Sequence, residues 1–553
     1  MARREKEWNA LKTIETDILV VGGGLAGLTA ALEAKKGNVS VTLLCRSKAG
    51  RSGNTLVSGS SLSVLNMDGG YGDSPEQFRD DLLNAGAGIN DRPMVDLFLD
   101  RSAEVLDMLR GYGVRFQTVD GEAAAKRPPG HSVRRYYSTD CSALSYMNRG
   151  LALTKPLLEQ AGRQGIVLLN DTTVLRLLTD HNGICGAVAM LNRTGELTIF
   201  RAGVVVLAAG GGCTLFSVNN NTADVSCDSY SLAYEAGALL RDMEIVQFYP
   251  TMMFEPVKLS IANPLFGDGA VLRNVAGEEF LHRYSDQGNM ATRDVMSRAV
   301  KSEIDAGRGN PKYVFVDCSG MDGDEIDKKY KELADRLREV HLDMKRDLIP
   351  IAPSAHFYIG GISIDGGCRT SVEGLLACGE AAGGLHGANR LAGVALAEAA
   401  VFGRIAGRTA ALLAGERRTS GMLPEADDQP GFRAGETKID ELTAAVRETM
   451  WKNASIVRSE ASLNDARREI EAVADAANSA EIANPTDLRK FRGLNSLLVT
   501  ARMLIEGSLL RRESRGAYYR SDFPESETGF FGNFFYRKGD DGALKISFKK
   551  YKP

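Results

Sequence analysis

The 553-residue chain has no run of about eighteen uninterrupted apolar residues, which a membrane-spanning helix requires. Its eight cysteines are scattered without a C-x-x-C pair, which excludes the usual haem-attachment and iron–sulfur spacings. An excess of one charge is also lacking, since 67 basic residues face 71 acidic ones, so nothing indicates a nucleic-acid partner. We expect a cytoplasmic chain in a reducing compartment, with no metal site and no direct membrane insertion.

A glycine-rich turn near the N-terminus is the first positive signal. Residues 17–21 form an apolar run typical of a buried parallel strand, and a helical pattern begins just after the turn. In Gly22-x-Gly24-x-x-Gly27 the first glycine permits a tight turn, the second lets backbone approach a pyrophosphate, and the third lets helix pack on strand. The motif predicts a dinucleotide site.

The residue that would hold a ribose hydroxyl departs from this motif. An acidic side chain is expected about twenty residues further on. Cys45 occupies that place, followed by Arg46, Ser47 and Lys48. This weakens an NAD interpretation and leaves the ribose to backbone groups or to Ser47, so the turn alone does not say which dinucleotide binds.

Further apolar runs indicate strands at 166–169, 184–190, 203–208 and 374–378. The glycine turns after the last two predict that the chain returns to the same sheet. Between about 250 and 350 the composition changes to short strands and charged helices, which indicates an inserted domain.

Several separated segments carry a family resemblance. After the glycine turn come residues 51–55 (RSGNT), 208–211 (AAGG), 354–361 (SAHFYIGG) and 379–404, which contains GE, HGANRLAG and FGR. Near the C-terminus stands ESRGAYYRSDFP. In this order the segments resemble the fumarate reductase and succinate dehydrogenase flavoprotein family, of which L-aspartate oxidase is a relative, over essentially the whole chain.

The resemblance implies an α/β fold with a Rossmann-like FAD-binding domain built from two blocks, residues 1–249 and 355–413. An α+β capping domain at 250–354 would be inserted between them and close over the flavin. A linker at 414–437 and a C-terminal helical domain at 438–553 would follow.

The resemblance also implies non-covalent FAD, because covalent members attach the flavin through a histidine and Asn54 stands at that position. Asp228 would support the cofactor, and Glu380 would accept hydrogen bonds from ribityl or ribose hydroxyls. A helix opening near 394–396 would direct its N-terminus at the flavin N1/C2 carbonyl. The residues implied to contact FAD are Gly22, Gly24, Gly27, Ser47, Lys48, Ser52, Gly53, Asn54, Thr55, Val174, Ala209, Gly210, Asp228, Glu380, Arg390, Ala395 and Leu396.

Three side chains match the family's centre for reducing an activated alkene. That reaction needs a hydride, cations that polarise a carboxylate, and an acid for the α-carbon. The resemblance implies that His356 and Arg390 clamp the carboxylate and that Arg293 is the proton donor in a dry site. Plainer interpretations stay open: a core histidine at 356, an ion pair within Arg293-Asp294, and a His386 that only donates to a loop carbonyl.

Two departures affect the other half of the pocket. The family's QFHPT reads QFYPT here, so Tyr249 replaces the histidine that binds a second carboxylate. The glutamate and arginine that relay protons are replaced by Asn263 and Phe266, which leaves Asp268 or water as the route. We count Tyr249 with the catalytic site and expect an unsaturated acid with a bulkier or less charged far end rather than fumarate.

The sequence therefore predicts an FAD-dependent oxidoreductase that acts on CH–CH groups. It would reduce the C=C bond of a small unsaturated carboxylate, or perform the reverse dehydrogenation, by hydride transfer at flavin N5. Electrons are expected from a separate subunit, for which an iron–sulfur protein is one candidate, or from a soluble carrier. Two alternatives stay open, an L-aspartate-oxidase-like amino acid oxidase and a flavin-bearing subunit with a degenerate active site.

Overall fold

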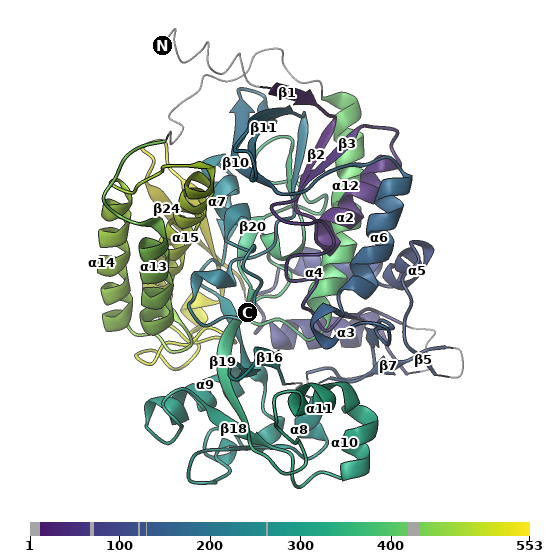
Figure 1. Cartoon of the computed structure of the whole chain (residues 1–553), viewed down its shortest axis with the longest axis vertical. Coiled ribbons are helices and arrows are strands. Elements are labelled where there is room, and N and C mark those ends of the chain that lie inside the picture. The colour runs from purple at the N-terminus through teal and green to yellow at the C-terminus, as the bar shows by residue number, and fades with distance from the viewer. Residues whose placement is uncertain are drawn as a thin grey trace.

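The computed structural model describes residues 12–66, 71–119, 122–128, 130–261, 264–417 and 432–552. Asn263 and most of the expected linker, at 418–431, lie outside these residues. Figure 1 shows a large body, a segment from the middle of the chain at its lower end, and a group of C-terminal helices beside it.

A five-stranded parallel sheet forms the centre of the body. All of its central strands are buried apolar runs. The spatial order is β21 (Leu375–Ala377), β13 (Val204–Leu207), β2 (Ile18–Val21), β3 (Val41–Leu44) and β9 (Val167–Leu169). The predicted return of the later strands to this sheet is confirmed, whereas the run at 184–190 belongs to another sheet.

Helices α2 (Leu25–Lys35) and α12 (Val394–Glu416) pack against each other beside this sheet. The two helices approach closely, because a Cβ at Gly407 would lie 2.3 Å from the carbonyl oxygen of Ala30. The other helices of the body are α3 (Pro75–Ala85), α4 (Arg92–Ser102), α5 (Val105–Gly111), α6 (Leu151–Arg163) and α7 (Asp228–Glu235).

Three further sheets belong to the body. The first contains, in spatial order, β1 (Lys12–Glu15), β12 (Leu197–Arg201), β11 (Gly183–Leu191) and β10 (Thr172–Asp180). The second contains β4 (Ser61–Ser63), β8 (Tyr136–Ser138) and β7 (Ala125–Lys126). The third contains β22 (Ala382–Gly383), β20 (Gly361–Ser363), β14 (Leu240–Arg241), β23 (Gly532–Lys538) and β24 (Leu544–Lys550).

The inserted segment has a hydrophobic core of its own, whose buried residues lie between Met253 and Ile351. Two long antiparallel strands, β15 (Val246–Met253) and β19 (Ile349–Tyr358), join it to the body. The expected domain boundaries fall inside these strands. The other elements are β16 (Leu259–Ser260), α8 (Pro264–Gly267), β17 (Val271–Arg273), α9 (Arg293–Asp305), β18 (Val314–Asp317), α10 (Gly323–Lys329) and α11 (Lys331–Arg338).

The C-terminal region contains three helices, α13 (Ile439–Ala454), α14 (Glu460–Ala477) and α15 (Pro485–Leu510). The expectation of a helical domain extending to residue 553 did not include the β23–β24 hairpin, which pairs with β14 of the body. Alternating Leu544, Ile546 and Phe548 carry the period of a strand. The chain therefore ends in the body's sheet.

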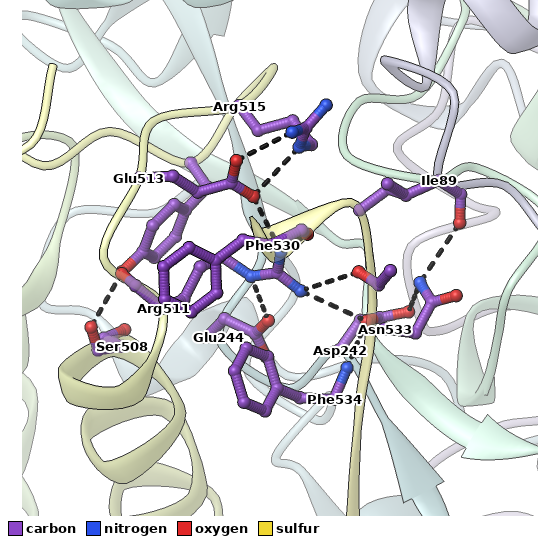
Figure 2. A network of polar contacts seen from close by, with 12 residues as sticks. Ile89, Asp242, Glu244, Ser508, Arg511, Glu513, Arg515, Phe530, Asn533 and Phe534 are labelled. Carbon is purple, nitrogen blue, oxygen red and sulfur yellow. Dashed lines mark hydrogen bonds and ion pairs between the residues drawn. The ribbon is translucent and has the colours of Figure 1, made fainter. Parts of the chain in front are cut away.

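A buried ionic network ties this hairpin to the body (Figure 2). The Arg511 guanidinium has no exposed side-chain surface and donates to the carboxylates of Glu244 at 2.7 Å and Glu513 at 2.9 Å. It also donates to the carbonyls of Phe530 and Gly532. Glu244 lies just before β15, so one cation connects the start of that strand to the C-terminal chain.

Replacing Arg511 by methionine should destabilise the protein by about 3–5 kcal/mol, because two buried carboxylates lose their shared cation. Urea unfolding followed by circular dichroism measures this change. The matched control is Lys490→Met, which removes an exposed pair with Asp440 and should cost under about 1 kcal/mol. Equal losses of stability in the two variants would contradict the stabilising role of the buried Arg511 network.

Candidate functional site

The glycine turn has the shape that its sequence predicts. Gly22 has φ +115°, and a Cβ there would lie 2.2 Å from the Ala208 carbonyl oxygen. A Cβ at Gly27 would lie 1.9 Å from the Gly22 oxygen. Gly24 is the N-cap of α2 and offers no side-chain cap, while the Thr55 hydroxyl accepts from the Leu25 N–H at 3.2 Å. The start of α2 is thus free of bulk and suited to a pyrophosphate.

Ser47 and Lys48 follow β3 in a loop held by its own backbone. The Ser47 carbonyl accepts from the Asp171 N–H, and the Lys48 carbonyl accepts from the Ser52 hydroxyl, both at 2.8 Å. Val174 lies on β10, and Ala209 and Gly210 follow β13. The structure thus gathers the predicted nucleotide residues around the carboxyl ends of the parallel strands.

Asp228 is held by protein groups. Its carboxylate pairs with Arg46 at 2.7 Å and accepts from the Ser496 hydroxyl at 2.8 Å. It therefore links the loop after β3 to α15, and its contact with the cofactor stays a prediction.

The loop before α12 is anchored at several backbone atoms. The Ala392 carbonyl lies 2.9 Å from both the Ser63 hydroxyl and His131 Nε2. Gln247 Nε2 donates to the Arg390 carbonyl at 2.8 Å. Gly393 caps α12 with φ +75° and no side-chain cap, and Ala395 and Leu396 lie in the first turn. The helix start and Arg390 are therefore fixed together.

Arg390 is a buried cation with little compensation from the protein. Only 7% of it is exposed, its Nε has no partner, and it forms no ion pair within the described part of the chain. Its guanidinium lies 4.7 Å from the centre of the Phe357 ring. Burial and the nearby charge of Arg293 lower its pKa to about 9, while Glu380 and Glu398 oppose this. Such a group favours an anionic ligand.

The predicted catalytic residues come together beside Arg390. The ring centres of Tyr249 and His356 are 5.3 Å apart, and the Arg293 guanidinium lies 5.2 Å from the Tyr249 ring centre. Burial, followed by the charges of Arg390 and Arg293, holds the pKa of His356 well below its usual value. A pKa in this direction favours the neutral form of the ring, and the part of His356 in clamping a carboxylate stays a prediction.

Asn54 and Glu380 meet next to this cluster. Asn54 Nδ2 donates to the Glu380 carboxylate at 3.1 Å, and the Tyr358 N–H donates to its other oxygen at 3.1 Å. Burial raises the pKa of Glu380 to about 7, although both hydrogen bonds and Arg390 act against this. The carboxylate thus titrates close to neutrality.

The residues expected near the far end of the substrate, Tyr249, Phe266 and Asp268, are held by other protein groups. The Tyr249 hydroxyl donates to the Ile261 carbonyl at 2.9 Å, and Phe266 is buried. Asp268 accepts from the Tyr330 hydroxyl at 2.6 Å and from Lys329 at 3.3 Å, and both of these partners lie on the inserted segment away from Arg293 in the sequence. Its role as a proton route therefore gains no support from these contacts.

Side-chain contacts decide two of the alternatives that the sequence left open, those for His386 and for Arg293-Asp294. His386 pairs through Nε2 with the buried carboxylate of Glu398 at 2.9 Å, not with a loop carbonyl. Asp294 pairs with Arg298 at 3.3 Å rather than with its neighbour Arg293. Arg404 pairs with Glu104, which supports a structural role for it.

Sequence reasoning did not find Asn220, Asn221 or Gln247. Asn221 donates to the His356 carbonyl, and Asn220 Oδ1 lies 3.1 Å from His356 Nδ1. A run of three asparagines at 219–221, in the long connection after β13, was the available signal, because polar loop residues often serve a site.

Comparison with known proteins identifies the family. Residues 17–396 match the family model described as FAD binding domain, and residues 443–552 match the one described as fumarate reductase flavoprotein C-term. The chain belongs to the fumarate reductase and succinate dehydrogenase flavoprotein family. It is an FAD-dependent oxidoreductase.

Similar flavoproteins cover nearly the whole chain. A fumarate reductase (CoM/CoB) subunit of Methanothermobacter marburgensis is 32% identical, over 93% of this chain and 95% of its own. L-aspartate oxidase of Caulobacter vibrioides is also 32% identical, over 96% and 98%. Mycobacterium smegmatis Sdh1 in complex with UQ1 superposes with a TM-score of 0.86 at 26% identity, over 98% of this chain and 95% of its own.

The flavoprotein fits its cofactor at both ends. The bulk-free start of α2 suits a pyrophosphate, and the uncapped start of α12 beside Arg390 suits the electron-rich side of a flavin. Within the described ranges no helix is long and apolar enough to cross a membrane, and no group of three or more potential ligands could hold a metal ion.

FAD affinity should depend on pH through Glu380. An ionised carboxylate accepts from sugar hydroxyls, so the affinity should fall as pH drops from 8 to 6 through the pKa of about 7. Glu380→Gln should bind FAD at least about tenfold more weakly at pH 8 and lose this pH dependence. Flavin fluorescence during reconstitution measures both effects. Glu196→Gln, a change on an exposed strand end, should retain the wild-type pH profile.

Proposed function

We propose that the flavoprotein reduces the C=C bond of a small unsaturated acid with one carboxylate, or performs the reverse dehydrogenation. The carrying observation is the buried Arg390 guanidinium, which has an unpartnered Nε and no ion pair in the described chain. A planar guanidinium offers parallel donors to a carboxylate. Bound FAD would supply hydride chemistry at its N5 atom.

Arg390 polarises the substrate by binding its carboxylate. The positive end of α12 begins at Val394, four residues later, and adds to the field on the same side. Withdrawal of charge into the carboxylate leaves the β-carbon electron-poor and able to accept a hydride. Gln247 and Ser63 donate hydrogen bonds to the Arg390 and Ala392 carbonyls, and these bonds hold the backbone that carries the guanidinium.

Arg293 is the proposed acid for the α-carbon. It begins α9 and lies against the Tyr249 ring rather than against a carboxylate. A guanidinium is a weak acid, yet in a dry site it can protonate a strongly basic carbanion. Its proton must be restored from water or from a group of the inserted segment.

Tyr249 and Phe266, at the expected far end of the substrate, support an acid other than fumarate. The Tyr249 hydroxyl already donates to the Ile261 carbonyl, so it does not present a free donor for a second carboxylate. Phe266 is buried in the core of the inserted segment, and it offers no charge in place of the family's arginine. A neutral or bulky substituent at the far end of the substrate therefore fits better than a second charge.

Electrons would come from a separate partner. One relative is named as one of the subunits of a fumarate reductase, which supports a partner protein, such as an iron–sulfur protein, or a soluble carrier. All eight cysteines are free and buried, which supports a reducing, cytoplasmic setting.

An amino acid oxidase is the second candidate, favoured by the full-length similarity to L-aspartate oxidase. It would remove hydride from a carbon bearing an amine and pass electrons to oxygen. Formation of hydrogen peroxide with L-aspartate would favour this function over enoate reduction.

The proposed reduction should appear in an anaerobic screen of small unsaturated acids against the photoreduced protein. At least one monocarboxylate should reoxidise the flavin faster than fumarate does. Arg293→Ala should keep its FAD and lose at least about a hundredfold in this rate, because it removes the general acid. Reoxidation by no acid, or an unchanged rate in Arg293→Ala, would contradict the proposal.

Tyr249→Phe should change turnover by less than about threefold, because the lost hydroxyl donates to backbone and takes no part in proton transfer. The variant should lose only about 1 kcal/mol of stability, since Thr251 also donates to the Ile261 carbonyl. Tyr249→His, which restores the family's residue, should improve binding of dicarboxylates. A hundredfold loss in Tyr249→Phe would instead make the hydroxyl part of the chemistry.

A further inference from the structure

Asn220 is placed beside the His356 ring by backbone pairing. Its segment runs next to β19, with the Ala355 N–H donating to the Val218 carbonyl and the Asn220 N–H donating to the Ala355 carbonyl, both at 3.1 Å. Asn220 Oδ1 then lies 3.1 Å from His356 Nδ1. The backbone pairing therefore places the Asn220 side chain next to the His356 ring.

A chain of amides fixes which atom of Asn220 faces the ring. The Thr222 N–H can only donate, and it donates to Asn54 Oδ1 at 3.2 Å. Asn54 therefore presents its Nδ2 to Asn221 Oδ1 at 2.9 Å and to the Glu380 carboxylate. The orientation of Asn54 follows from a backbone group alone.

The other end of the chain is anchored in the same way. The His356 carbonyl can only accept, and Asn221 Nδ2 donates to it at 2.9 Å. The same Nδ2 faces Asn220 Oδ1 at 3.4 Å. Turning the Asn220 amide over would set two NH₂ groups against each other. Asn220 thus offers an acceptor to the ring, and the hydrogen lies on His356 Nδ1.

We propose that Asn220 is a positioning residue that holds His356 in its neutral Nδ1–H form, so that Nε2 gains a proton when the substrate carboxylate binds. The inference rests on the proposed function in placing that carboxylate beside Arg390. It deepens that function by assigning the protonation state of His356, which lies beside Arg390 at the proposed carboxylate site.

The surrounding charges explain why the proton arrives with the anion. The groups that face the ring are Arg390, Arg293 and the Tyr249 phenol, and the two guanidiniums disfavour a third positive charge. An unprotonated Nε2 would turn its lone pair towards a carboxylate oxygen, which is repulsive. One proton taken from solvent converts this contact into a charge-assisted hydrogen bond and leaves again with the product.

The tautomer is tested by NMR on ¹⁵N-histidine-labelled protein with FAD bound. His356→Gln identifies the signal among the six histidines. We expect a protonated Nδ1 and a bare Nε2 at pH 7–8. Asn220→Leu should shift the population towards Nε2–H, whereas Asn220→Asp should keep Nδ1–H and raise the pKa of the ring. A wild-type ring with Nε2–H and a bare Nδ1 would overturn the proposal.

The matched control is Asn182→Ala, because Asn182 also contacts a histidine ring, that of His181, but in an exposed turn. It should leave the His356 signal unchanged. A shift as large as that in Asn220→Leu would show that the signal does not report on the Asn220 contact, and would overturn the assignment.

Proton uptake tests the second half of the proposal, with crotonate as the probe. Binding is followed by the flavin spectrum, and close to one proton per site should be taken up from solvent at pH 8. The Kd for crotonate should therefore rise about tenfold for each unit by which the pH is raised. Asn220→Leu should bind with little uptake, because Nε2 already carries hydrogen. Binding to the wild type without uptake would overturn proton coupling. A spectrum that crotonate leaves unchanged would count against the proposed function, while NMR still decides the tautomer.

Discussion

The buried guanidinium of Arg390 is the constraint around which this site is organised. A cation removed from water is costly unless charge or hydrogen bonds compensate it. The protein provides a ring face, one carbonyl and two carboxylates at longer range, and leaves Nε unsatisfied. The remaining compensation must come from a ligand, so the ground state of the protein already favours an anion at this point.

The neighbours of Arg390 reduce the free-energy cost of its buried charge without neutralising that charge. His386 and Glu398 form a closed pair behind the Phe357 ring, and Glu380 is held by Asn54 and the Tyr358 backbone. These carboxylates act on the guanidinium through space and do not form an ion pair with it. A direct pair would have satisfied Arg390 and removed its affinity for a substrate.

Much of the fold could be predicted from the sequence because it depends on local patterns. The turn at 22–27 must be glycine where Cβ atoms would meet backbone, and buried strands that end in glycine identify the central sheet. The β23–β24 hairpin was missed because its alternation is short and charged residues interrupt it.

The grouping of Tyr249, His356, Arg293 and Arg390 was predicted through family resemblance, since the four lie far apart in the chain. The amide chain through Asn54, Asn221 and Asn220 was not predicted. Its meaning depends on which atom of each amide faces which backbone group, and no residue pattern contains that information. Likewise, the lowered pKa of His356 follows from burial of its ring and from two arginines that only the folded chain brings near it.

The two long strands that join the body to the inserted segment have a mechanical consequence. Tyr249 lies on β15 and His356 on β19, while Ser297 of α9 donates to the Phe248 carbonyl and Arg298 donates to the Gly516 carbonyl. Arg293 is therefore mounted on the seam between the two cores and not on the outer part of the segment. Because Met296 and Val300 of the same helix belong to the core of the inserted segment, a shift of that core would be transmitted to Arg293 and through it to the reacting groups.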